Sequence, residues 1–256
     1  MLKIFKYEVL NLFQSSTIWI YTLFVFLLTF GFAFFTGDPS KTVSAVLSLV
    51  VFLLPIIVMI LTIMDYYNSR EFIGMILSYP LSRTSVFLGK FLAMFFVLTV
   101  SWTIGYLLPI IVRGWTYDYA IWLYISGLIV VWVCIPLALL FGILNDDKVA
   151  GVGLVIGVWL LFTLIYDALI LIISLSFRNY PVEKMIILLT LLNPIDLARI
   201  LVVRTMDIAI LMGYTGALFE TFLRGKVGIV LAFLSISLWI AIPTILAKVI
   251  FNRKDW

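Results

Sequence analysis

The chain has 256 residues, of which 64% are hydrophobic and only 12% are charged, and its mean hydropathy is +1.23. A soluble domain of this composition would have too few polar side chains to cover its surface, so a soluble protein is excluded and a membrane protein is predicted. The net charge of +4 is small and no run of basic residues occurs, which argues against a nucleic-acid partner.

Six long apolar stretches, each close to the ~20 residues that a helix needs to cross a bilayer, dominate the chain. Before them, residues 1–16 place apolar side chains on one helical face, with Lys3 and Lys6 off it, which predicts an interfacial helix. The predicted spans are residues 17–35, 43–64, 89–112, 120–144, 149–175 and 227–250. Six crossings put both termini on one side, and the short loops concentrate Lys and Arg there, so both termini are predicted to be cytoplasmic. We therefore expect an all-α polytopic membrane protein with a single transmembrane domain over residues 1–256.

A segment between the second and third spans, residues 65–85, is too polar at its start to insert and too apolar afterwards for a plain loop. Arg70 and Glu71 give it a polar entry, apolar side chains then recur at helical spacing, and Pro80 is expected to end the helix. The apolar positions are Phe72, Ile76 and Tyr79. This pattern predicts a short surface helix, and a membrane-lying connector without a partner is the alternative.

A second irregular segment, residues 176–226, follows the fifth span. Pro181 suits the first turn of a helix whose apolar stretch, 182–192, is about half as long as a crossing, and Asn193-Pro194 ends it. The next helix carries opposite charges three residues apart, in the pairs Asp196 with Arg199 and Arg204 with Asp207. Two half-length helices on the outer side predict a re-entrant hairpin or an external cap, which serves either as a lid or as a partner-binding element.

Two features lie inside the fifth span. Asp167 stands in apolar sequence, where a charge costs about 2.5–3.5 kcal/mol at a helix centre, so it is expected to have a partner. The arginines considered as partners are Arg178, Arg199 and Arg204. A structural pair that locks the external segment is favoured over a substrate-handling or proton-carrying role. Gly153 and Gly157 form a G-x-x-x-G pair, which predicts close helix packing, either between two copies of the chain or within one.

Residue content excludes several kinds of chemistry. The chain has no histidine, which rules out His-based acid–base catalysis, Ser-His-Asp triads and HExxH zinc sites. Cys134 is the single cysteine and lies in an apolar run, and the methionines form no local motif, so no metal site is expected. No G-x-x-x-x-G-K-[ST] phosphate loop occurs, so the chain is expected to hydrolyse no ATP and to hold no cofactor itself.

The segment before the third span resembles the permease subunits of ABC-2 type transporters. The residues that carry the resemblance are Arg70, Glu71, Gly74, Leu77, Pro80, Ser82, Arg83, Gly89 and Lys90. Met75 departs from the pattern, because many members have threonine there. In that family the segment is a cytoplasmic coupling helix that docks into a separate ATPase, which holds ATP and magnesium. The resemblance implies an ATPase-coupling site at residues 70–83, cytoplasmic termini and a location in the inner membrane.

Within this family the chain is most similar to the Nos-type permeases of the copper-processing system that matures nitrous oxide reductase. The carriers are Tyr166-Asp167 and residues 192–199, 213–217 and 251–256. The likeness implies a homodimer that works with an ATPase dimer and a periplasmic accessory protein in assembling a copper–sulfur centre.

The cargo is constrained by composition. With no histidine and one cysteine, the chain lacks the ligands of a copper path, so a sulfur-containing cargo or mechanical action on the periplasmic partner is favoured over copper. Two other functions stay open at this point. One is an ABC-2 exporter of a lipid, drug or polysaccharide precursor, and the other is a membrane anchor or assembly factor that has no ATPase.

Overall fold

The structure is a computed structural model that describes residues 1–36, 39–112, 118–177, 183–203 and 226–254. Every regular element in these ranges is a helix. The elements are α1 (Leu2–Gln14), α2 (Ser16–Thr36), α3 (Pro39–Asn68), α4 (Arg70–Leu77), α5 (Arg83–Val112), α6 (Asp118–Leu144), α7 (Lys148–Leu160), the π turn η1 (Leu161–Ile165), α8 (Tyr166–Ser176), α9 (Glu183–Leu191), α10 (Pro194–Val203) and α12 (Lys226–Arg253). The predicted all-α polytopic architecture is confirmed.

Six helical stretches are long and apolar enough to cross a membrane, at the six predicted places. They are α2, Lys41–Asn68 of α3, α5, Ala120–Leu144 of α6, the α7–η1–α8 helix (Lys148–Ser176) and Val230–Arg253 of α12. The helix of the second span extends past its apolar stretch to Asn68, and the helix of the third span begins before its apolar stretch, at Arg83. A helix satisfies its own backbone hydrogen bonds, so it can extend beyond the hydrocarbon core.

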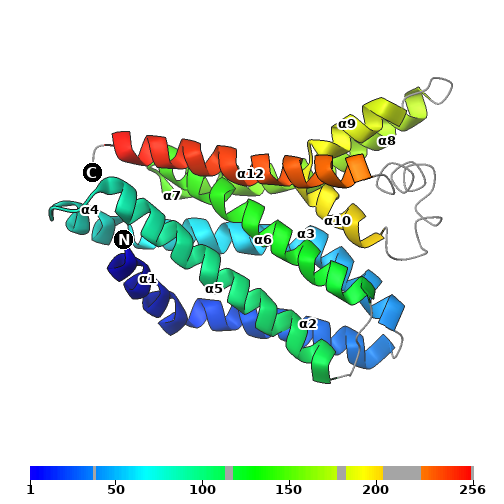
Figure 1. The fold of residues 1–256 in the computed structure, drawn as a ribbon, viewed down its shortest axis with the longest axis horizontal. Helices are drawn as coiled ribbons and strands as arrows, with labels where there is room; N and C mark the ends of the chain where they lie inside the picture. The colour runs from blue at the N-terminus through cyan, green and yellow to red at the C-terminus, as the bar shows by residue number, and fades with distance from the viewer. Residues whose placement is uncertain (37–38, 113–117, 178–182, 204–225, 255–256) are drawn as a thin grey trace.

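The bundle has two distinct ends. Both termini and α4 lie at one end, and we name it the terminal end (Figure 1). The turn between α6 and α7 belongs to the same end, because Arg70 and Lys254 both contact it. The bend between α9 and α10 lies toward the opposite, distal end (Figure 1). The first irregular segment and the described helices of the second therefore lie in opposite halves of the molecule.

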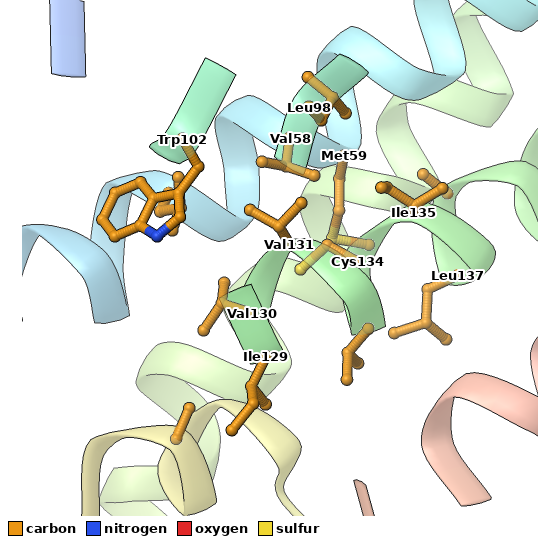
Figure 2. Close-up of a cluster of buried hydrophobic side chains, with 14 of the residues drawn as sticks. Val58, Met59, Leu98, Trp102, Ile129, Val130, Val131, Cys134, Ile135 and Leu137 are labelled. Atoms are coloured by element: carbon orange, nitrogen blue, oxygen red, sulfur yellow. The ribbon is translucent and has the colours of Figure 1, made fainter. Parts of the chain in front are cut away.

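The central helix of the bundle is α6, which packs against α3, α5, α10 and α12. In its most apolar stretch 78% of residues are buried, against 11% in the fifth span. Figure 2 shows Cys134 of α6 beside Met59 of α3, and each side chain is 1% exposed. Gly127 lies directly against Trp102 of α5, where a Cβ would come within 2.1 Å of the indole ring. Cys134, which the sequence places in an apolar run, is therefore a buried core residue.

The coupling segment is shorter than the sequence predicts. The helix α4 ends at Leu77 rather than at Pro80. The Ser78 hydroxyl donates to the Met75 carbonyl at 2.7 Å, and the Tyr79 amide bonds to the Ile76 carbonyl at 3.1 Å. Both hydrogen bonds join residues three positions apart. They tighten the last turn, and the α-helix ends before Pro80.

Candidate functional sites at the two ends of the bundle

At the terminal end, α4 buries one side and exposes another. Ile73 is 1% exposed and fixes the helix on the core, although the sequence analysis did not select it. Phe72 is half-buried because its ring stacks on Tyr7 of α1, with ring centroids 5.2 Å apart. Ile76 is also partly buried against the core. Two residues of the predicted apolar stripe therefore face mainly inward.

Three apolar side chains on α4 and on the turn that follows it are exposed. Met75 is 55% exposed, Tyr79 62% and Leu81 44%. We call these three residues the coupling surface. Tyr79 is the member that the sequence analysis selected, Met75 lies within α4, and Leu81 lies in the turn that follows the helix. The polar residues Glu71 and Ser82 flank this surface and are exposed.

The first residue of α4 is tied to another loop. Arg70 pairs with the Asp146 carboxylate, and its Nη1 donates to the Asp146 carbonyl at 2.8 Å. Lys254 Nζ lies 2.8 Å from the same carboxylate. Lys254 and then Arg70 hold the pKa of Asp146 below its ordinary value of 3.8, so the pairing is intact at neutral pH and is lost only in stronger acid. We call Arg70, Asp146 and Lys254 the terminal clamp.

Arg83, at the start of α5, reinforces this arrangement. Its Nη1 donates to the carbonyls of Asn252 at 2.9 Å and Lys254 at 2.8 Å. The Asn252 side chain in turn donates to the Thr84 hydroxyl at 3.1 Å. Two predicted coupling residues, Arg70 and Arg83, therefore bind inside the chain and hold α4, α5, α12 and the α6–α7 turn together. The sequence analysis did not select Asp146, and it gave Asn252 and Lys254 only as part of the 251–256 resemblance, without this role.

The α6–α7 turn is also fixed by close packing. The Tyr67 hydroxyl is shared between the carbonyls of Asn145 at 3.1 Å and Asp147 at 3.2 Å. Asp147 caps α7 by accepting hydrogen bonds from the amides of Val149 and Ala150. Gly151, one turn into α7, lies against the Tyr67 ring.

Gly151→Ala is expected to destabilise the protein by about 1–3 kcal/mol, the usual cost of overpacking. A Cβ at this position would lie 1.9 Å from Tyr67 Oη, and the ring cannot move without breaking its bonds to the α6–α7 turn. Gly31→Ala is the matched control, because this glycine also lies inside a helix, α2, and a Cβ there meets nothing within 4 Å. Thermal unfolding of the purified protein in detergent measures both. Equal unfolding temperatures for the two variants would contradict this account of the turn.

In the distal half, Asp167 of α8 has the type of partner that the sequence predicts. Arg199 Nη1 lies 3.2 Å from the Asp167 carboxylate, and Arg199 Nη2 lies 2.5 Å from Asp196, three residues earlier on α10. Asp196 is 4% exposed, so its charge depends on Arg199. We call Asp167, Arg199 and Asp196 the distal lock. It joins the fifth span to α10.

The corner between α9 and α10 is built on Asn193. The two helices meet at 104°, and Asn193 is fully buried between them. Its Oδ1 caps α10 by accepting from the amides of Ile195 at 3.1 Å and Asp196 at 3.3 Å. Its Nδ2 donates to the Phe162 carbonyl at 2.8 Å. Phe162 lies in η1, so Asn193 binds the fifth span at its π turn.

Further contacts hold the same corner from both sides. Tyr166 donates its hydroxyl to the Leu189 carbonyl of α9, and the Ser235 hydroxyl of α12 donates to the Leu191 carbonyl at 2.5 Å. The buried side chains of α10 pack against α6 and α3. The helices α9 and α10 form a sharply bent pair, and whether it is a re-entrant hairpin or an external cap stays a prediction. Pro181 and Arg204, the other predicted residues of this site, lie outside the described residues.

Gly153 and Gly157 lie on an open face of α7. Both are exposed, and a Cβ at either position would meet nothing within 4 Å. The close packing predicted for this pair therefore does not occur within the described part of one chain. Packing against a second copy stays a prediction.

A multi-pass bundle with a short helix and turn at one end and a bent helix pair toward the other has the organisation of a transporter permease. The chain belongs to the ABC-2 family of transporter proteins, whose pattern matches residues 72–256. It is 27% identical to the probable ABC transporter permease protein NosY of Stutzerimonas stutzeri, over 86% of this chain and 82% of that protein. It is 28% identical to the protein of the same name from Pseudomonas aeruginosa, with the same coverage of each.

Proposed function

We propose that the chain is a Nos-type permease that couples ATP hydrolysis in a separate ATPase to an action at the distal end of the bundle. The coupling surface carries this proposal. It consists of exposed apolar side chains on the α4 turn, which is fixed to the span ends by the terminal clamp and by Arg83. Exposed apolar residues on a rigid support are suited to protein binding. ATP and magnesium are then bound by the partner.

The proposal sets the orientation and the assembly. The coupling surface, both termini and the terminal clamp face the cytoplasm, and the protein lies in the inner membrane. One chain has a single coupling surface, whereas ABC ATPases act in pairs, so the unit contains two copies of the permease related by a two-fold axis. The open face at Gly153 and Gly157 is available for close contact between the copies.

The action at the distal end follows from the similarity to the NosY permeases over 86% of the chain. We assign to this chain a role in assembling the copper–sulfur centre of nitrous oxide reductase, together with a periplasmic accessory protein. The bent pair α9–α10 is the element that transmits the movement outward. The chain has no histidine, and Cys134 is buried in the core, so the cargo is a sulfur-containing species or the action is mechanical.

Tyr79→Asp is expected to reduce the amount of ATPase that co-purifies with the permease by at least about tenfold, because interface hot spots contribute about 2 kcal/mol or more. Tyr79 is a better probe than Phe72, whose ring is stacked on Tyr7. Val149→Asp is the control, since this exposed apolar residue lies at the same end, on the first turn of α7. The complex formed by the parent protein is expected to contain two permease and two ATPase chains by native mass spectrometry. Equal recovery of ATPase with both variants would contradict the proposed coupling surface.

A further inference from the structure

Three charged side chains meet between α1, α3 and α5 near the terminal end. Lys90 Nζ of α5 lies 2.6 Å from the Asp65 carboxylate of α3 and 3.7 Å from the Glu8 carboxylate of α1. Glu8 is 3% exposed and Lys90 is 6% exposed. We call these residues the ionic triad. Buried charges are retained in proteins when they are paired, and here one ammonium group serves two carboxylates.

The two carboxylates are not equivalent. Asp65 receives the hydrogen bond from Lys90, whereas Glu8 Oε2 is buried and has no hydrogen-bond partner among the described residues. Burial raises the pKa of Glu8 above its ordinary value of 4.5, and Lys90 offsets only part of that effect. When Glu8 is ionised, the ionic triad has two negative charges and one positive charge. The negative charge that Lys90 does not neutralise is that of Glu8, on α1.

The ionic triad is connected to α4 along two routes. The Asp65 carbonyl accepts hydrogen bonds from the Ser69 amide at 3.0 Å and the Ser69 hydroxyl at 2.6 Å, and Ser69 directly precedes α4. On the second route, Tyr7 stands next to Glu8 in α1 and stacks on Phe72 of α4. A change in the position of α1 would uncover Phe72.

We propose that the ionic triad is a proton-sensitive hold that keeps α1 on α4, with Lys90 as its positioning residue and Glu8 as the charge that makes the hold reversible. Lys90 fixes the start of α4 through its hydrogen bond to Asp65, and its ammonium group, 3.7 Å from the Glu8 carboxylate, offsets only part of the cost of burying that charge. When Glu8 is ionised, the surplus charge weakens the docking of α1. When Glu8 is protonated, that surplus is removed and α1 is held.

Among the described residues, Lys90 and Asp65 are the charged groups that act on the Glu8 carboxylate. The helix α2 contains no acidic or basic residue, α5 contributes Lys90, and α3 contributes Asp65. On α4, Arg70 is paired with Asp146, and Glu71 is exposed. A group whose pKa is raised on docking takes up a proton, so docking is strongest below pH 4.5 and weakens as pH rises through the raised pKa of Glu8.

The docking of α1 can be measured by the reaction of a maleimide with a thiol introduced by Leu12→Cys, in a Cys134→Ala background. Leu12 is 4% exposed on the docked face of α1, so its thiol reacts only when α1 is released. Tyr79→Cys, at an exposed position, corrects for the dependence of thiol reactivity on pH. The full chain in membrane vesicles is labelled at about pH 5 and about pH 8, a range that lies above the ordinary carboxyl pKa.

The expected result is a corrected labelling rate that rises from the lower to the higher pH in the parent protein. Lys90→Gln should raise the rate at the higher pH by about tenfold or more, because two buried carboxylates then lack a cation. Glu8→Gln should have the opposite effect, with a rate at or below that of the parent and no dependence on pH. A merely structural role of Glu8 would make both substitutions increase labelling, and that outcome would overturn the proposal.

Glu8→Gln keeps the shape of the side chain and decides the question if Lys90→Gln fails to fold. The labelling assay contains no ATPase, and it rests on the proposed function only in naming α4 the coupling helix. If labelling follows the expected order while Tyr79→Asp still retains ATPase, the hold stands and the coupling surface is wrong. If Tyr79→Asp releases ATPase while Glu8→Gln increases labelling, the proposed function stands and the hold is wrong.

Discussion

Arg199→Ala is expected to destabilise the protein by about 3–5 kcal/mol. The substitution leaves Asp196, which is only 4% exposed, without the cation that lies 2.5 Å away. Asp167→Asn should cost much less. The Asp167 side chain is 41% exposed, and Arg199 keeps its contact with Asp196 in that variant. Chemical unfolding of the purified protein in detergent measures the order of the two losses.

A double variant separates the buried charge from the loss of packing. Adding Asp196→Asn to Arg199→Ala removes the unpaired carboxylate, so part of the lost stability should return. An Arg199→Ala protein that is no less stable than Asp167→Asn would show that the distal lock is solvated and contributes little. A double variant that is less stable than Arg199→Ala alone would contradict the assignment of the cost to Asp196.

The spans could be predicted from the sequence because lipid leaves the backbone few choices. A helix is the structure that satisfies its own hydrogen bonds, so a long apolar stretch fixes both the type and the approximate length of the element. The same reasoning identified Asp167 as a residue in need of a cation, and Arg199 is that cation. The Asn193-Pro194 corner was also predicted, because proline cannot continue the preceding helix.

Contacts between distant segments could not be predicted in this way. The sequence analysis gave Glu8 no role, yet Glu8 is buried because α1 packs on α5 and Glu8 meets Lys90 there. Asp146 and Lys254 form the terminal clamp only because the α6–α7 turn and the end of α12 converge on Arg70. Charged residues next to span ends were the available signal, but their pairing depends on the tertiary packing of the helices.

The coupling helix shows the same limit on a smaller scale. The helical spacing of apolar residues predicted a helix with an apolar stripe. The same spacing does not say which side of a short helix packs against the rest of the protein. The stripe contains Phe72, which packs on Tyr7, and Tyr79, which is exposed after the helix has ended. The buried anchor is Ile73, between the selected positions.

Asp167→Asn is expected to separate ATP hydrolysis from its effect at the distal end. The terminal clamp and the coupling surface lie at the opposite end of the bundle and are unchanged, so the ATPase should still bind and turn over. The link between α8 and α10 loses its charge pair, so the fifth span and the bent pair no longer move as one body. Asp167→Glu keeps the charge and is the control that should restore function.

The direct test of this account is to measure two quantities in one set of variants: ATP turnover by the reconstituted permease–ATPase complex, and the copper–sulfur centre of nitrous oxide reductase matured in cells that carry the same permease. For Asp167→Asn we predict ATP turnover within about twofold of the parent, a change of less than about 0.5 kcal/mol in the activation barrier. We predict that the reductase in those cells lacks its copper–sulfur centre, and that Asp167→Glu restores it. Normal ATP turnover together with a normal copper–sulfur centre in Asp167→Asn would contradict the transmission of ATPase work through the distal lock.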